Sequence, residues 1–216
     1  MLQKIQRFGG AMLMPSILFA FFGLVVGLTS ILKNPNLVGS IATEGTLWYN
    51  FWFVVEQGGW TIFNQMPVVF ALGIPIGLAK KANGRAALEA FLIYMVYNYF
   101  INGFLTQFKF FGVDVTPALK LPTGITRIAG AITLDTSIIG SIVIASISVW
   151  IHNKYFDKKL PELLGIFQGS TFVILVGFLI MIPAAFLTAL LWPKVQLGIA
   201  ALQGFLKVSG VAGVFT

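Results

Sequence analysis

Long runs without an ionisable side chain are the feature that most constrains how this chain can fold. Between Arg7 and Lys33 no acidic or basic residue occurs, and four comparable intervals follow. They lie between Glu56 and Lys80, Glu89 and Lys109, Asp135 and Lys154 (interrupted only by His152), and Glu162 and Lys194. A bilayer core is about 30 Å thick, so a helix that rises ~1.5 Å per residue needs ~20 apolar residues to cross it. Five such runs in 216 residues predict an all-α integral membrane protein.

The runs also predict where the chain crosses the membrane. About five transmembrane helices are expected, near residues 10–32, 66–79, 86–104, 135–151 and 170–191. Residues 47–55 (LWYNFWFVV) are too short to cross and are rich in Trp and Tyr, which favour the membrane–water boundary. Near 195–208, apolar residues recur at helical spacing opposite a polar stripe, which predicts an amphipathic surface helix. No span is assigned to 106–134, where a re-entrant segment is an alternative.

The positive charge of the chain indicates topology and not nucleic-acid binding. The net charge is +7, from 14 Lys and Arg against 7 acidic residues, and the basic residues fall in short loops between spans. Cytoplasmic loops collect Lys and Arg. The denser clusters are therefore placed in the cytoplasm: Lys4, Arg7, Lys80, Lys81, Arg85, Lys154, Lys158 and Lys159. This predicts a multi-pass protein of the cell membrane with a cytoplasmic N-terminus, a retained first helix and residue 216 outside.

Residues that could carry chemistry are few. The chain has no cysteine, which excludes thiol chemistry on its own residues, and it has one histidine. A metal site needs several ligands at suitable spacing, which a single histidine without cysteine does not supply. Most of the acidic residues fall in loops between the predicted spans. The sequence therefore predicts no metal, no cofactor and no catalytic residue in this chain.

Two ionisable residues at the ends of the span predicted at 135–151 are candidates for a substrate contact. His152 stands beside Asn153 and Lys154 at a helix end. We favour a boundary residue near the headgroups over a proton or phosphate contact. Asp135 opens the span, where an acid is costly unless it caps or pairs. We favour a capping role for Asp135 over a substrate contact. In that role its carboxylate accepts hydrogen bonds from the free N–H groups at the positive end of the helix.

The span predicted at 86–104 contains the two other candidates, Asn98 and Asn102. Together with Tyr94 they recur every four residues and so share one helix face. Asparagine is costly in lipid and usually finds a partner on another helix. Helix packing or a dimer contact is therefore favoured over sugar binding.

Two shorter patterns concern helix contacts. Gly73 and Gly77 form a small-xxx-small pair that permits close approach of another helix. Glu89 follows Arg85 by four residues, which favours an ion pair on the helix surface. The alternative for Glu89 is a buried polar group that faces a sugar path.

Several segments together resemble a known family. They are the opening KIQRFGGAMLMPSILFAFFGLVVGL, the segment MPVVFALGIPIGLAKKANGRAALEAF, the short LDTSIIGSIV, and HNKYFDKKLPELLGIFQGSTFV. In order and spacing they resemble the IIC permeases of the bacterial phosphoenolpyruvate–sugar phosphotransferase system. Gln168 and Ser137 stand where the family usually has glycine. The segments GIFQG and WPKVQ are most similar to the maltose and α-glucoside branch.

The resemblance implies a function that this chain carries in part. The parent would couple uptake of maltose or another α-glucoside to its phosphorylation, as a protein-phosphocysteine–sugar phosphotransferase in the bacterial inner membrane. The phosphate would come from a phosphorylated IIB partner. The chain is expected to be the N-terminal half, the dimerisation and scaffold half of a homodimer. The family's His-His segment and Gly-Ile-Thr-Glu-Pro-like loop do not occur here, so the sugar-binding half is expected to be missing and the chain to be a fragment.

Two alternatives are weighed against a working permease component. One is a structural membrane module, or a truncated remnant without function. The other is an unrelated secondary transporter, which is disfavoured because no predicted span carries the paired intramembrane charges expected of ion coupling. Lipid and sugar are thus the expected small-molecule partners, without nucleic acid.

Overall fold

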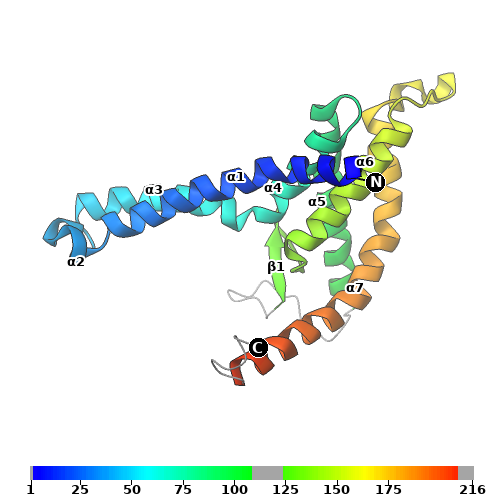
Figure 1. Ribbon diagram of the computed structural model, residues 1–216. Helices are drawn as coiled ribbons and strands as arrows, with labels where there is room; N and C mark the ends of the chain where they lie inside the picture. The colour runs from blue at the N-terminus through cyan, green and yellow to red at the C-terminus, as the bar shows by residue number, and fades with distance from the viewer. Residues whose placement is uncertain (1, 109–123, 209–216) are drawn as a thin grey trace. The chain divides into compact units, whose positions relative to one another are not determined.

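The computed structural model describes residues 2–108 and 124–208, and most of its elements are helices (Figure 1). In chain order they are α1 (Leu2–Leu32), α2 (Pro35–Val38), η1 (Ser40–Ala42), α3 (Leu47–Asn64), α4 (Met66–Leu78), α5 (Asn83–Phe108), β1 (Ile125–Ile128), β2 (Ala131–Leu134), α6 (Ser137–Tyr155), η3 (Glu162–Phe167) and α7 (Ser170–Val208). The chain divides into two compact units. The first consists of Met1–Phe91 and Ser137–Lys154, the second of Leu92–Thr136 and Tyr155–Thr216.

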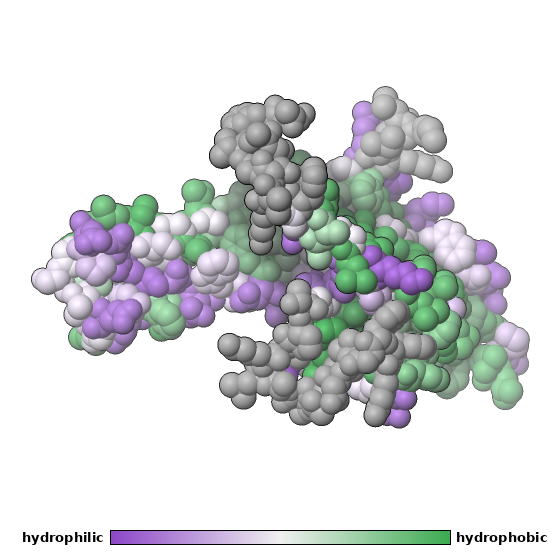
Figure 2. Space-filling model, turned by 90° about the horizontal axis from the view of Figure 1, so that it is seen from below, coloured by the Kyte–Doolittle hydropathy of each residue, from purple (hydrophilic) through white to green (hydrophobic). Residues whose placement is uncertain are grey.

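The described residues contain four helices that are long and apolar enough to cross a membrane. They are Gln6–Leu32 of α1, α5, α6 and Ser170–Gly204 of α7. The bent pair of α3 and α4 brings the number to five if the two helices form one span. Large apolar side chains such as Leu24, which is 74% exposed, lie on the surface of α1, and Figure 2 shows apolar residues over much of the molecular face that it presents. Such exposure suits a lipid solvent. The predicted class, an all-α integral membrane protein with about five transmembrane helices, is confirmed.

The helix expected at 47–55 is longer in the structure. α3 continues to Asn64 and is followed, after a 60° bend, by α4. Glu56 was taken as the end of the apolar stretch, but it lies within the helix, where Ser30 of α1 and Lys33, directly after α1, bond its carboxylate. The bend falls at Gln65, and Pro67 follows in the first turn of α4, where a missing N–H is tolerated.

The core of the first unit lies where α1, α4 and α6 meet. Phe70, Ile74 and Ala145 are buried there. Phe19 of α1 stacks on Phe70 with ring centroids 5.7 Å apart. The close approach predicted for Gly73 and Gly77 is confirmed: a Cβ at Gly73 would meet Pro15, and one at Gly77 would meet Ala11, each within 2.6 Å.

The second unit contains a feature that the sequence did not predict, the antiparallel hairpin of β1 and β2. Ile125 pairs with Leu134 and Ile128 with Ala131. The two turn residues, Ala129 and Gly130, both have positive φ, which is the backbone of a two-residue turn whose twist matches that of the strands. The hairpin lies within 106–134, the segment left without a span; residues 109–123 of that segment lie outside the described residues.

α7 is one helix of 39 residues, with Pro183 and Pro193 inside it. The sequence separated a span at 170–191 from an amphipathic helix at 195–208, because Pro193 falls between them. In the structure the helix passes through Pro193 without a break. A location of residues 195–208 at the membrane surface stays a prediction. Along its length α7 packs on α5, with Phe178 against Phe100 at 4.9 Å and Phe186 against Phe104 at 5.5 Å between ring centroids.

Candidate functional site

Asn98 and Asn102 of α5 attach the hairpin to the helix. The Asn98 carboxamide oxygen accepts a hydrogen bond of 3.2 Å from the Thr133 hydroxyl. The Asn102 amide donates to the Ile132 carbonyl oxygen at 2.7 Å, one residue earlier on the same strand. Asn98 and Thr133 are fully buried. Asn98 and Asn102, one helical turn apart, thus bond to successive residues of β2. The partner that the sequence placed on another helix lies on a strand.

The hairpin is also held at its turn and its base. The Tyr99 hydroxyl donates to the Ala129 carbonyl oxygen at 2.9 Å. At the base, Gln196 of α7 donates through Nε2 to the carbonyl oxygens of Gly124 and Asp135, at 2.9 and 3.2 Å. Trp192 Nε1 also donates to Asp135, at 2.8 Å. α5 and α7 therefore supply side-chain hydrogen-bond donors to backbone oxygens of the hairpin and of the residues that flank it.

We expect Asn98→Leu to lower the free energy of unfolding by about 1–3 kcal/mol, because Thr133 would keep a buried hydroxyl without its acceptor. The measurement is unfolding in mixed detergent micelles. Asn50→Leu, at an exposed position of α3, is the matched control and should change stability by less than about 0.5 kcal/mol. Equal stability of the two variants would contradict the structural role of Asn98.

Asp135 contributes its backbone to this arrangement. Its N–H donates to Gly124 at 2.9 Å, and its carbonyl oxygen receives the bonds from Trp192 and Gln196. The residue follows β2 directly, and α6 begins two residues later at Ser137. The cap role of its carboxylate stays a prediction.

His152 lies in the first unit, in a buried contact with Glu89. Its side chain is 2% exposed and that of Glu89 is 1% exposed. Nδ1 lies 2.6 Å from Glu89 Oε2, and Nε2 lies 2.9 Å from the carbonyl oxygen of Lys81. Glu89 is therefore not on the helix surface, as the pairing with Arg85 had suggested. His152 is buried within the protein in the last turn of α6, and its position near the headgroups stays a prediction.

The structure brings three of the four candidates into one unit. Asn98, Asn102 and Asp135 all contact the hairpin or its base, whereas His152 belongs to the other unit. Among residues 2–108 and 124–208, no group of three or more His, Cys, Asp or Glu side chains could hold a metal ion. The candidates thus occur as structural contacts, and sugar binding by any of them stays a proposal.

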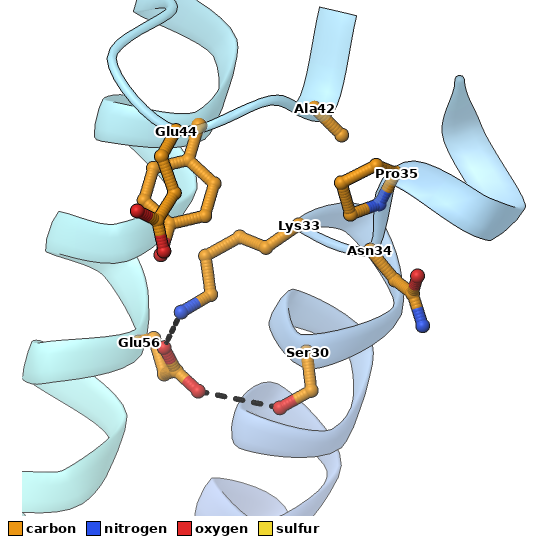
Figure 3. Close-up of a pocket in the computed structure, with 8 residues that line it drawn as sticks. Ser30, Lys33, Asn34, Pro35, Ala42, Glu44 and Glu56 are labelled. Carbon is orange, nitrogen blue, oxygen red and sulfur yellow. Dashed lines mark hydrogen bonds and ion pairs between the residues drawn. The ribbon is translucent and has the colours of Figure 1, made fainter. Parts of the chain in front are cut away.

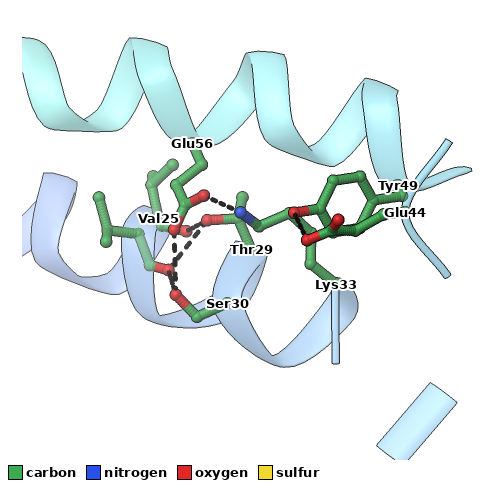
Figure 4. A network of polar contacts seen from close by, with 8 residues as sticks. Val25, Thr29, Ser30, Lys33, Glu44, Tyr49 and Glu56 are labelled. Carbon is green, nitrogen blue, oxygen red and sulfur yellow. Dashed lines mark hydrogen bonds and ion pairs between the residues drawn. The ribbon is translucent and has the colours of Figure 1, made fainter. Parts of the chain in front are cut away.

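A polar pocket that the sequence did not predict lies at the α2 end of the first unit (Figure 3). Its volume is about 350 Å³, and it is lined by Ser30, Lys33, Asn34, Pro35, Ala42, Glu44, Tyr49 and Glu56. Lys33 bonds Glu56 and lies 5.3 Å from the centre of the Tyr49 ring, whose hydroxyl donates to Glu44 at 3.4 Å. Figure 4 shows how Ser30 and Thr29 of α1 continue this network. The signal in the sequence was the pair of charges that end two apolar runs, Lys33 and Glu56.

We expect Lys33→Met to lower the free energy of unfolding by about 2 kcal/mol, between the values for exposed and for fully buried ion pairs. Both side chains are largely buried, so the Glu56 carboxylate would lose its cation in a poorly solvated place. Adding Glu56→Gln should recover part of the loss, because the amide is neutral and can still bond Ser30. A double variant as unstable as the sum of the two single variants would contradict this pairing.

The apolar helices define the class as a multi-pass membrane protein. Its buried polar side chains join helices to one another, to a loop and to the hairpin. Two buried pairs of ionisable side chains, Lys33 with Glu56 and Glu89 with His152, lie in the first unit. The class of transporter has to come from comparison with known proteins.

A family model described as "Phosphotransferase system, EIIC" matches residues 9–216. The chain therefore belongs to the EIIC family of the phosphotransferase system. The α-glucoside-specific EIICB component of Leptotrichia buccalis is 56% identical over the whole chain, and the maltose-specific EIICB component of Bacillus subtilis is 54% identical. The glucose-specific EIICBA component of Staphylococcus carnosus is 32% identical over 98% of the chain. The chain spans 40%, 41% and 31% of the length of these relatives, respectively.

Proposed function

We propose that the chain is part of a permease that takes up an α-glucoside, such as maltose, and couples its entry to phosphorylation. The observation that carries the proposal is the identity of 54–56% with α-glucoside- and maltose-specific relatives over all 216 residues. A glucose-specific relative is 32% identical, and another maltose-specific relative, from Escherichia coli, is 31% identical. The proposal therefore rests on the high identity to the first two relatives and not on the lower identity to the glucose-specific one.

The proposal gives this chain a scaffold role and places the phosphoryl donor elsewhere. Phosphoryl transfer needs groups that position the acceptor hydroxyl and stabilise charge. In the described residues the buried polar side chains examined above bond to other parts of the chain, and the chain has no cysteine that could carry phosphate. The donor in the proposal is a phosphorylated IIB domain, and the EIICB names of two relatives support it. The scaffold is proposed to form a homodimer in the bacterial inner membrane.

The test is phosphoenolpyruvate-dependent phosphorylation by membranes from cells that express the whole gene containing this segment. Maltose, another α-glucoside and glucose are offered with the soluble phosphotransferase proteins. We expect phosphorylation of the α-glucosides well above that of glucose, and none when phosphoenolpyruvate is omitted. Equal rates for glucose would overturn the substrate class, and no phosphorylation of any sugar would overturn the coupled activity.

The proposed orientation has a separate test. With a cytoplasmic N-terminus, Asn36 would lie outside the cell and Asn83 inside. Reporter fusions that are active on one side only should therefore give opposite signals at these two positions. A cytoplasmic signal at Asn36 would reverse the orientation.

A further inference from the structure

The contact between His152 and Glu89 has an unusual arrangement of hydrogen-bond acceptors. Each ring nitrogen of His152 faces an oxygen, Glu89 Oε2 at 2.6 Å from Nδ1 and the Lys81 carbonyl at 2.9 Å from Nε2. A carbonyl oxygen only accepts, so Nε2 must carry a hydrogen. A neutral imidazole has one N–H, which would leave the bare Nδ1 against the carboxylate oxygen. Two lone pairs at 2.6 Å would repel, so a second hydrogen has to lie between Nδ1 and Oε2.

We propose that Glu89 of α5 and His152 of α6 form a buried proton-binding site that joins the two helices. The proton lies either on Nδ1, as an imidazolium–carboxylate pair, or on Oε2, as a carboxylic acid that donates to neutral imidazole. In both forms the pair is neutral as a whole, which its burial requires. The inference concerns the scaffold and does not depend on the proposed substrate.

The surroundings of the pair favour a proton shared by His152 and Glu89 over an imidazolium without a carboxylate beside it. The charged residues of the same elements are Lys80 and Lys81 of the loop, Arg85 of α5 and Lys154 of α6, all with exposed side chains. These cations would oppose an isolated imidazolium, and the Glu89 carboxylate compensates for them. The second carboxylate oxygen, Glu89 Oε1, is buried without a hydrogen-bond partner. A carboxylate left there without a proton or a cation beside it would be costly.

The loop between α4 and α5 is attached to the same end of α6 by two other hydrogen bonds. The Lys81 carbonyl oxygen accepts from His152 Nε2 at 2.9 Å, and Asn153 Oδ1 accepts from the Lys80 N–H at 2.8 Å. Neither bond uses the hydrogen between Nδ1 and Oε2. The shared proton therefore joins α5 to α6, and the loop contacts persist without it.

Nuclear magnetic resonance of the histidine ring tests the proton directly. His152 is the only histidine, so the 216-residue chain labelled with 15N-histidine in lipid nanodiscs needs no assignment. At about pH 7, near the ordinary titration range of histidine, we expect an N–H on Nε2 together with one of two signatures. Either Nδ1 also carries a hydrogen, or infrared difference spectra show a protonated carboxyl that Glu89→Gln removes. A bare Nδ1 without a protonated carboxyl would overturn the proposal.

Glu89→Gln separates the proton from mere packing. Its amide can donate to neutral Nδ1, so the ring should carry one N–H, on Nε2, and the protonated-carboxyl signal should be absent. A second ring N–H in Glu89→Gln would overturn the role of the carboxylate in the site.

Discussion

Gly77→Val is expected to destabilise the first unit more than any other single substitution of a glycine in α4. A Cβ at this position would lie 2.4 Å from the Ala11 Cβ and 2.6 Å from its Cα. The Cα belongs to the backbone of α1, so no rotation of a side chain can relieve the overlap, and the two helices have to separate. Overpacking of this kind typically costs about 1–3 kcal/mol, and the two further methyl groups of valine place the expected loss at the upper end.

The measurement for Gly77 is the free energy of unfolding in mixed micelles together with the amount of folded protein in membranes. Gly27→Val is the matched control, because Gly27 also lies in a membrane helix and has nothing within 4 Å of its added Cβ. Gly73→Ala should show a smaller loss, since its Cβ would meet only the ring atoms of Pro15. Equal effects at Gly77 and Gly27 would mean that α1 and α4 do not approach as described.

The second large effect is expected at Glu89 and His152. Removing one partner of a buried charged pair typically costs about 3–5 kcal/mol, because the other group stays buried without compensation. Glu89→Leu and His152→Leu should each approach this loss. The double variant should be more stable than either, since apolar side chains replace both groups and only the Lys81 carbonyl loses a donor, at about 1 kcal/mol.

A control for this pair is available on the same helix. Ser148 is also buried, one turn before His152, but its hydroxyl donates to the Ile144 carbonyl of its own helix at 2.8 Å. Ser148→Ala should therefore change stability by less than about 1 kcal/mol. If the losses of Glu89→Leu and His152→Leu simply add in the double variant, the two side chains do not interact.

The sequence was sufficient for features that depend on local pattern. Apolar runs without charge predicted the membrane class, because the bilayer sets the length of a helix. The pair Gly73 and Gly77 predicted a close helix contact, which Pro15 and Ala11 of α1 provide. The family resemblance rested on ordered segments over nearly the whole chain, and the family match to residues 9–216 agrees with it.

The features that were missed depend on partners far away in the sequence. Glu56 was read as the end of an apolar segment, because its cation, Lys33, lies 23 residues earlier. Glu89 was assigned to Arg85, four residues away, whereas the histidine beside it in space is 63 residues away. The hairpin has strands of only four residues and an Ala-Gly turn, which is a weak turn signal. Its attachment to α5 gives the asparagines of that helix a partner that helical spacing cannot reveal.

The attachment of the hairpin to two helices has a consequence for biosynthesis. Synthesis proceeds from the N-terminus, so Asn98 and Asn102 are made before the strands that they bind, and these contacts can form as soon as residue 134 has left the ribosome. The carbonyl oxygen of Asp135 obtains its donors, and that of Gly124 its second donor, only when Trp192 and Gln196 have been made. The second unit is therefore completed in two stages, with the insertion of α6 and most of α7 between them.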